Sequence, residues 1–149
     1  MVPGPHSCWR ALSFSDRNRL VMRTLLKKII PEWRVDEAET AVEAVAIVKK
    51  GAPDVDVVLF DEDFGFDIAN VEARKVGTDA TKEMRAYLRL ATKETRVGRR
   101  RMLIVGCTGY ESDAHRRVAL AAGQDHVLGK PYQAAAIKKV ILDWWLAAR

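Results

Sequence analysis

Four groups of polar residues in this sequence stand directly after short apolar runs. The groups are Ser15-Asp16, Asp61-Glu62-Asp63, Cys107-Thr108 and Gly129-Lys130-Pro131. A carboxylate has a reference pKa of about 3.9, so it is ionised at pH 7 and is a competent nucleophile toward a phosphoryl group. Clustered carboxylates repel one another unless a cation lies among them, and Mg²⁺ prefers carboxylate and phosphate oxygens as ligands. Lys130 can neutralise one phosphate oxygen and Thr108 can donate its hydroxyl to another, so these residue types suit phosphoryl transfer.

The apolar pattern predicts the elements that must position these groups. Strands are expected over residues 9–14, 33–36, 56–61, 102–105 and 126–128. Helices are expected over residues 17–30, 40–50, 78–90, 111–122 and 133–148. In the first, second and last of these, apolar residues recur at i, i+3, i+4 and i+7, and Gly123 ends the fourth. Residues 62–76 show no clear period and are expected to form a long loop. Strands that alternate with helices imply right-handed crossovers and a parallel sheet covered on both faces.

The predicted fold is therefore α/β, a flavodoxin-like (βα)5 three-layer sandwich with a parallel sheet in the order 2-1-3-4-5. We expect residues 1–8 to be an N-terminal extension and residues 9–149 to form one domain. In such folds, ligands bind beyond the carboxyl ends of the strands. All four polar groups follow predicted strands, so we expect them to meet at this edge of the sheet.

Composition narrows the functional class. The 149 residues are 48% hydrophobic and 30% charged, which is typical of a globular domain rather than a disordered chain. The two cysteines, Cys8 and Cys107, are expected to be separate reduced thiols. No apolar stretch approaches the roughly 20 residues that span a bilayer, and the first residues lack the pattern of a signal peptide. The sequence thus favours a cytoplasmic protein with no membrane segment.

The net charge of +5 permits an acidic or phosphorylated partner without requiring one. Part of the excess lies in residues 93–101, which a nucleic-acid surface could use to neutralise phosphates. No aromatic residue interleaves this run, so it offers no stacking platform for single strands. We interpret it as a solvated loop before a strand and expect no nucleic-acid partner.

Taken in order, four segments resemble the receiver domain of two-component signalling. Residues 56–61 resemble its third strand with the phosphoacceptor aspartate, and residues 77–85 resemble the start of its third helix. Residues 102–108 resemble the fourth strand with its hydroxyl residue, and residues 122–131 resemble the fifth strand with its lysine-proline pair. The resemblance runs from about residue 9 to residue 147 and is greatest to receivers of hybrid histidine kinases.

The resemblance implies a specific site. Asp61 would be the phosphoacceptor, with Thr108 and Lys130 contacting the phosphoryl group. Asp16, Asp61 and the backbone carbonyl of Asp63 would hold Mg²⁺. The donor would be a phosphohistidine on a histidine kinase or a histidine phosphotransfer protein, and phosphorylation would switch a protein-protein interaction. The chain would then be a signalling domain rather than an enzyme, apart from self-catalysed phosphorylation and dephosphorylation.

Two alternatives stay open, and three departures from the family pattern motivate the first. Ser15 replaces one acid of the usual pair, Val127 stands where the family has an aromatic residue, and the loop over residues 62–76 is longer. These departures favour a pseudo-receiver, an interaction module that is not phosphorylated. Asp61-Glu62-Asp63 also resembles the Asp-x-Asp motif of haloacid-dehalogenase-like phosphatases. Those enzymes place the motif on their first strand and need a further acidic pair near the end of the chain. In this sequence no such pair follows Lys130-Pro131.

Overall fold

The computed structural model describes residues 10–14, 19–51, 55–62, 77–91, 101–108, 113–131 and 133–147. Within these ranges five strands alternate with five helices. The strands are β1 (Arg10–Phe14), β2 (Arg34–Ala38), β3 (Val57–Glu62), β4 (Leu103–Thr108) and β5 (His126–Gly129). The helices are α1 (Arg19–Ile29), α2 (Ala41–Gly51), α3 (Gly77–Ala91), α4 (Asp113–Ala122) and α5 (Ala134–Ala147).

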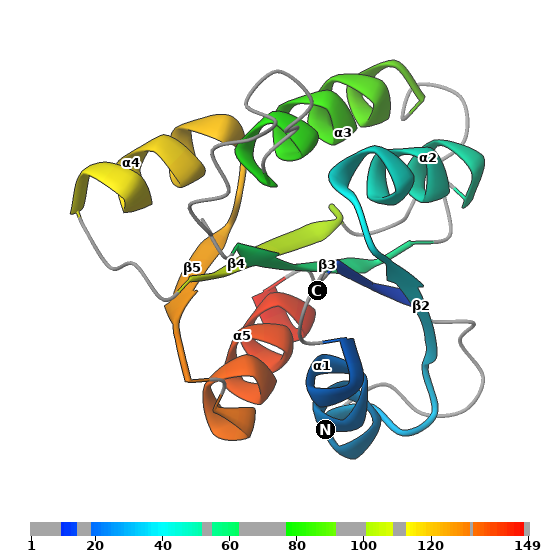
Figure 1. The fold of residues 1–149 in the computed structure, drawn as a ribbon, viewed down its shortest axis with the longest axis vertical. Helices are drawn as coiled ribbons and strands as arrows, with labels where there is room; N and C mark the ends of the chain where they lie inside the picture. Colours follow the sequence, from blue (N-terminus) through cyan, green and yellow to red (C-terminus); the bar gives the residue numbers. More distant parts are fainter. Residues whose placement is uncertain are drawn as a thin grey trace.

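The strands form one parallel sheet in the order β2-β1-β3-β4-β5. Figure 1 shows α1 and α5 covering one face of this sheet and α2, α3 and α4 covering the other. The predicted flavodoxin-like three-layer sandwich is therefore confirmed. The chain runs outward from β1 to β2 and then returns past β1 to β3, so the winding reverses between β1 and β3. In open α/β sheets, ligands bind at the carboxyl ends of the strands beside this reversal.

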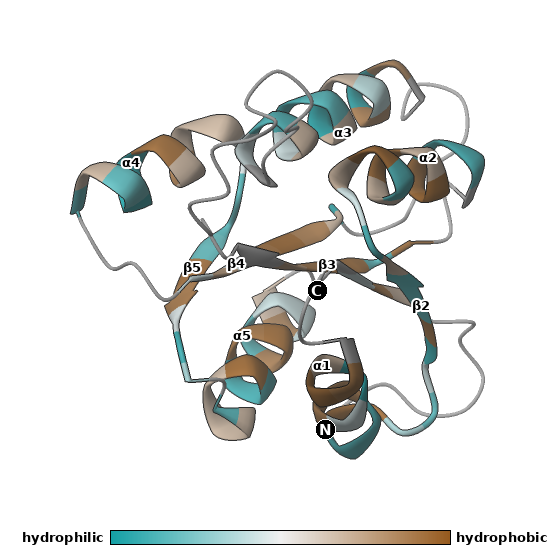
Figure 2. Cartoon of the chain, in the orientation of Figure 1, coloured by the Kyte–Doolittle hydropathy of each residue, from teal (hydrophilic) through white to brown (hydrophobic). Residues whose placement is uncertain are grey.

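Alternation along the central strands divides the apolar core into two clusters. Val57 and Leu59 of β3 belong to the cluster on the side of α1 and α5. Val58 and Phe60 belong to the cluster on the side of α2 and α3. Both faces of β3 are thus buried, which explains why its sequence is apolar without alternation. Figure 2 shows hydrophobic residues between the layers and hydrophilic residues on the outward surfaces of the helices.

Signals in the sequence set both the faces and the ends of the helices. The predicted apolar stripe of α2, formed by Ala41, Ala44, Val45 and Val48, is buried. Before α2, the Thr40 hydroxyl accepts a hydrogen bond from the backbone N–H of Glu43 at 3.1 Å, which is the geometry of a helix N-cap. After α4, Gly123 has φ of +112°, a conformation that L side chains rarely adopt.

Some predicted boundaries are wrong. β4 extends to Thr108, beyond the predicted end at residue 105, because Gly106 and Cys107 also pair with β3. β2 covers Arg34–Ala38 rather than residues 33–36, and Trp33 instead lies buried in the core just before it. Cys107 is buried and forms no disulfide with any residue that the structure describes. The expected extension over residues 1–8, Cys8 and the segment 63–76 lie outside the described residues.

Ser13 provides a test of the packing. Its side chain on β1 is 1% exposed, and its hydroxyl has no hydrogen-bond partner among the residues described. An unpaired buried hydroxyl destabilises a fold by about 1–3 kcal/mol. Ser13→Ala should therefore raise the free energy of unfolding, measured by urea denaturation, by about 1 kcal/mol. Ser13→Thr keeps the hydroxyl and should give no such gain. A clear loss of stability in Ser13→Ala would show that the hydroxyl is paired.

Candidate functional site

The register of the sheet brings the ends of β3, β4 and β5 side by side. Asp61 pairs with Cys107 and Glu62 pairs with Thr108, and Thr108 in turn pairs with Gly129. The backbone N–H of Lys130 donates to the carbonyl oxygen of Thr108 at 2.8 Å, which extends the pairing by one residue. The backbone positions of Asp61, Thr108 and Lys130 therefore meet at one edge of the sheet, as the sequence predicts.

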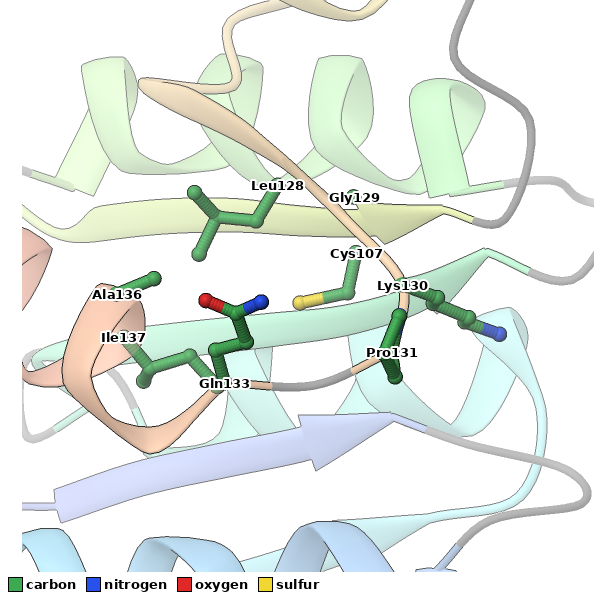
Figure 3. A pocket seen from close by; sticks show the side chains of 8 residues that line it. All are labelled: Cys107, Leu128, Gly129, Lys130, Pro131, Gln133, Ala136 and Ile137. Carbon is green, nitrogen blue, oxygen red and sulfur yellow. The ribbon is translucent and has the colours of Figure 1, made fainter.

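Two of these residues have side chains removed from solvent. Thr108 is 1% exposed. Lys130 is half-buried, and its Nζ atom is out of contact with solvent. An ammonium group removed from water is stable only when an anion or several acceptors lie close to it. The ammonium group of Lys130 is thus not solvated, as it would be if the Lys-Pro pair merely ended a strand at the surface. Figure 3 shows its side chain pointing away from the pocket that its neighbours line.

The remaining predicted site residues are described in part or not at all. For Asp61 and Glu62 the structure describes the backbone, and Ser15, Asp16 and Asp63 lie outside the described residues. Among the side chains described, no three His, Cys, Asp or Glu residues cluster to hold a metal ion. The three predicted Mg²⁺ ligands Asp16, Asp61 and Asp63 are not among those side chains, so their role as ligands stays a prediction.

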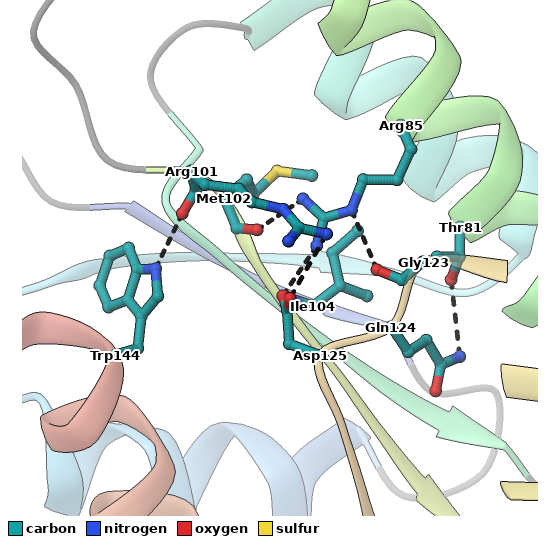
Figure 4. A network of polar contacts seen from close by, with 9 residues as sticks. All are labelled: Thr81, Arg85, Arg101, Met102, Ile104, Gly123, Gln124, Asp125 and Trp144. Atoms are coloured by element: carbon teal, nitrogen blue, oxygen red, sulfur yellow. Dashed lines mark hydrogen bonds and ion pairs between the residues drawn. The ribbon is translucent and has the colours of Figure 1, made fainter. Parts of the chain in front are cut away.

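Sequence reasoning missed a polar network at the opposite edge of the sheet, which Figure 4 shows. Arg85 of α3 is 9% exposed and uses three of its nitrogens. Its Nε donates to the Gly123 carbonyl at 3.0 Å, and its Nη1 donates to the Met102 carbonyl at 2.7 Å. Its Nη2 pairs with Asp125 Oδ2 at 2.7 Å. Arg85 therefore joins α3 to the amino ends of β4 and β5.

Asp125 connects this network to the neighbouring elements. Its Oδ2 also accepts a hydrogen bond from the backbone N–H of Ile104 at 2.9 Å. Its Oδ1 lies 3.5 Å from Nη2 of Arg101, whose carbonyl accepts a hydrogen bond from Trp144 Nε1 of α5 at 2.8 Å. Arg101 is the one residue of the basic run 93–101 that the structure describes, and it is exposed. Arg85 stands next to the buried stripe of Ala80, Met84 and Leu88 on α3. This position was the one signal in the sequence that could have predicted its burial.

Gln124 is a buried amide beside β4 and α3. A Cβ atom on Gly106 would lie 2.3 Å from Gln124 Oε1, so the glycine makes room for this buried amide. Gln124 Nε2 reaches Thr81 of α3 at 3.5 Å. Val127 pairs with Gly106 and is 5% exposed. The strand position where the resemblance leads one to expect an aromatic residue is therefore a buried aliphatic one.

No helix in the described part of the chain is long and apolar enough to span a membrane. No protein-family model matches the sequence, and no curated protein matches it either. Solved structures do match, and receiver domains are among them. A chain from the co-crystal of the *Saccharomyces cerevisiae* histidine phosphotransfer protein Ypd1 and the receiver domain of the response regulator Ssk1 has a TM-score of 0.73 and 23% identity. The match covers 96% of this chain and 93% of that one.

Two further neighbours agree. The receiver domain of the *Pseudomonas aeruginosa* sensor histidine kinase PA1611, with a magnesium ion in its active-site cleft, has a TM-score of 0.65 and 23% identity. That match covers 91% of this chain and 95% of the other. A receiver domain protein from *Clostridium thermocellum* has a TM-score of 0.68 and 18% identity, with coverages of 93% and 94%. The chain thus has the receiver-domain fold, and its solved neighbours include the receiver domain of a sensor histidine kinase.

The Arg85 network predicts a large stability effect. Arg85→Met would remove the guanidinium from the Asp125 carboxylate and from the carbonyls of Met102 and Gly123, so we expect a loss of about 3–5 kcal/mol in the free energy of unfolding. Lys82→Met removes an exposed cation from the same helix and should change it by less than about 0.5 kcal/mol. Urea denaturation of the two variants measures both values. Equal effects would contradict a structural role for Arg85.

Proposed function

We propose that this chain is a phosphoacceptor receiver domain. In this proposal, Asp61 accepts a phosphoryl group from a phosphohistidine of a histidine kinase or a histidine phosphotransfer protein. The observation that carries the proposal is the meeting of Asp61, Thr108 and Lys130 at the carboxyl edge, with the Lys130 ammonium removed from water. A buried cation at this edge favours an anion beside it, and the acid position 61 lies two strands away in the same sheet. The receiver fold of the solved neighbours supports the same reading.

The proposed chemistry requires positioning and charge neutralisation rather than proton transfer. A carboxylate oxygen of Asp61 attacks the phosphorus atom as the bond between phosphorus and the donor's imidazole nitrogen breaks. The electron pair of that bond stays on the imidazole, and Asp61 becomes an acyl phosphate. Lys130 neutralises one phosphoryl oxygen, and the Thr108 hydroxyl donates a hydrogen bond to another. The net result is transfer of one phosphoryl group from histidine to aspartate.

Asp16, Asp61 and the backbone carbonyl of Asp63 would hold Mg²⁺. This donor set consists of oxygen atoms, which is the chemistry that Mg²⁺ prefers, and Asp61 stands at the strand end beside Thr108. When bound, Mg²⁺ supplies neutralisation of the charge on the phosphoryl oxygens. The PA1611 receiver contains a magnesium ion in its active-site cleft, which supports the same assignment here.

The proposed output is a change in binding to a protein partner in the cytoplasm. The Ssk1 receiver crystallises with a histidine phosphotransfer protein, and a *Borrelia burgdorferi* neighbour is a CheX-CheY complex. Buried Val127 cannot signal by the movement of an aromatic ring, so the response must use other groups. The same residue favours the alternative of a pseudo-receiver that binds partners without being phosphorylated.

Intact mass spectrometry separates the two. After incubation with acetyl phosphate and Mg²⁺, the wild-type chain should gain one phosphoryl group, and Asp61→Asn should gain none while remaining folded by circular dichroism. Glu62→Gln, which neutralises the adjacent acid, should still gain one. Persistent labelling of Asp61→Asn would contradict the assignment of Asp61. If neither acetyl phosphate nor a phosphorylated histidine phosphotransfer protein labels the wild type, the chain is a pseudo-receiver.

A further inference from the structure

The side chain of Gln124 lies at a junction of three elements. Its backbone N–H donates to the Ala119 carbonyl at 3.1 Å, so the residue is fixed just after the end of α4. The next residue, Asp125, donates its backbone N–H to the Ile104 carbonyl of β4 at 2.8 Å. Gln124 is 3% exposed, and Figure 4 shows its amide nitrogen directed at the hydroxyl of Thr81 on α3. The buried amide thus lies between β4 and α3.

This amide lies on the face of β4 that also carries the Thr108 side chain. Ile104 belongs to the core cluster on the side of α2 and α3, whereas Cys107 belongs to the cluster on the other side. Because side chains alternate along a strand, positions 106 and 108 face the same side as Ile104. A Cβ atom on Gly106 would lie 2.3 Å from Gln124 Oε1, so the amide fills that position. Thr108 is the next residue on this face, roughly 6.6 Å further along the strand.

The contact between Gln124 and Thr81 is long for a hydrogen bond. Its N···O distance is 3.5 Å, whereas N–H···O bonds in proteins are most often about 2.9–3.0 Å. Thr81 is fully buried, so both groups lie where the local dielectric constant is low. In such surroundings a polar contact gains strength as it shortens. A movement of β4 that brings the amide closer to Thr81 is therefore favoured by this pair.

We propose that Gln124 transmits the occupancy of the phosphoacceptor site to α3. In this proposal, which rests on the proposed function, the Thr108 hydroxyl donates to a phosphoryl oxygen and draws the end of β4 toward the carboxyl edge. The amide that fills the space at Gly106 then closes on Thr81. Val127, which pairs with Gly106, has an aliphatic side chain, so the adjoining amide supplies the polar response that it cannot. Because coupling between two sites is reciprocal, loss of the Thr81 hydroxyl must weaken binding at the phosphoacceptor site.

A titration with beryllofluoride and Mg²⁺ tests the proposal. Beryllofluoride mimics a phosphoryl group, and the CheX-CheY neighbour is a complex that contains it with Mg²⁺. In the wild-type chain, the backbone ¹H–¹⁵N resonances of Thr108 and Lys130 should shift saturably. A side-chain amide proton of Gln124, assigned through its bonds to the backbone, should move downfield with the same Kd because its hydrogen bond shortens. An unmoved Gln124 amide beside shifted Thr108 and Lys130 would overturn this proposal and leave the proposed function standing. No shift at any of the three residues would overturn both.

A thermodynamic cycle separates coupling from packing. Thr81→Val removes the hydroxyl at nearly constant volume and should raise the Kd for beryllofluoride by about fivefold, the lower end of typical coupling between sites. Thr24→Val makes the same change on the exposed face of α1 and should leave the Kd unchanged. Gly106→Ala combined with Gln124→Ala fills the same space with a methyl group, and adding Thr81→Val to this double variant should change the Kd no further. A Kd that Thr81→Val does not raise, or an equal rise in the double-variant background, would overturn the proposal. The wild-type titration decides the question even where a variant fails to fold.

Discussion

The pairing of three parallel strands at their carboxyl ends is the constraint on which the rest of this structure depends. β3, β4 and β5 lie in register so that Glu62, Thr108 and Gly129 form one row across the sheet. The hydrogen bond from the Lys130 N–H to the Thr108 carbonyl continues that row past the end of β5. A shift of one residue along any of these strands would turn its apolar side chains to the opposite face, so burial in two clusters fixes the register. The position of the candidate site thus follows from the packing of the core.

The two edges of the sheet differ in how their polar groups are used. At the amino edge, Arg85 and Asp125 are held by each other and by backbone groups of Met102, Ile104 and Gly123. Such a network rigidifies the surrounding chain because breaking it leaves buried groups unpaired. At the carboxyl edge, the acid positions of β3 end the same sheet as Lys130, whose Nζ atom is shielded from solvent. The amino ends of β4 and β5 are thus held rigidly, and the proposed phosphoacceptor site lies at the opposite, carboxyl ends of the strands. This arrangement suits a domain whose proposed role is to respond to a charge placed at its carboxyl edge.

Much of the fold could be predicted from local pattern, because the signals are local in the chain. The unbroken apolar run of β3, the stripe of α2 and the glycine after α4 each act over a few residues, and all three have the predicted structure. The strand that reaches Thr108 was predicted too short, because Gly106 breaks the apolar pattern. The reason for a glycine at position 106 lies 18 residues further along the chain, because the Gln124 side chain fills the space that a larger residue would need.

The features that sequence reasoning missed depend on contacts between distant residues. Arg85 is separated from Asp125 by 40 positions, and no motif relates them. Their place after strands predicts the site residues as a set, and the structure describes the backbone register that aligns Asp61, Thr108 and Lys130. The contributions of Asp16 and Asp63 remain a prediction.

The central claim is that Asp61 carries the phosphoryl group, and chemical mapping of the acyl phosphate tests it most directly. Borohydride reduces an aspartyl phosphate to homoserine, so the chain would be phosphorylated with Mg²⁺ present, reduced, digested and sequenced by mass spectrometry. The account predicts homoserine at position 61 alone, and none when Mg²⁺ is omitted. Homoserine at position 16 or 63 would contradict the account. So would the absence of homoserine from a chain that intact mass shows to be phosphorylated.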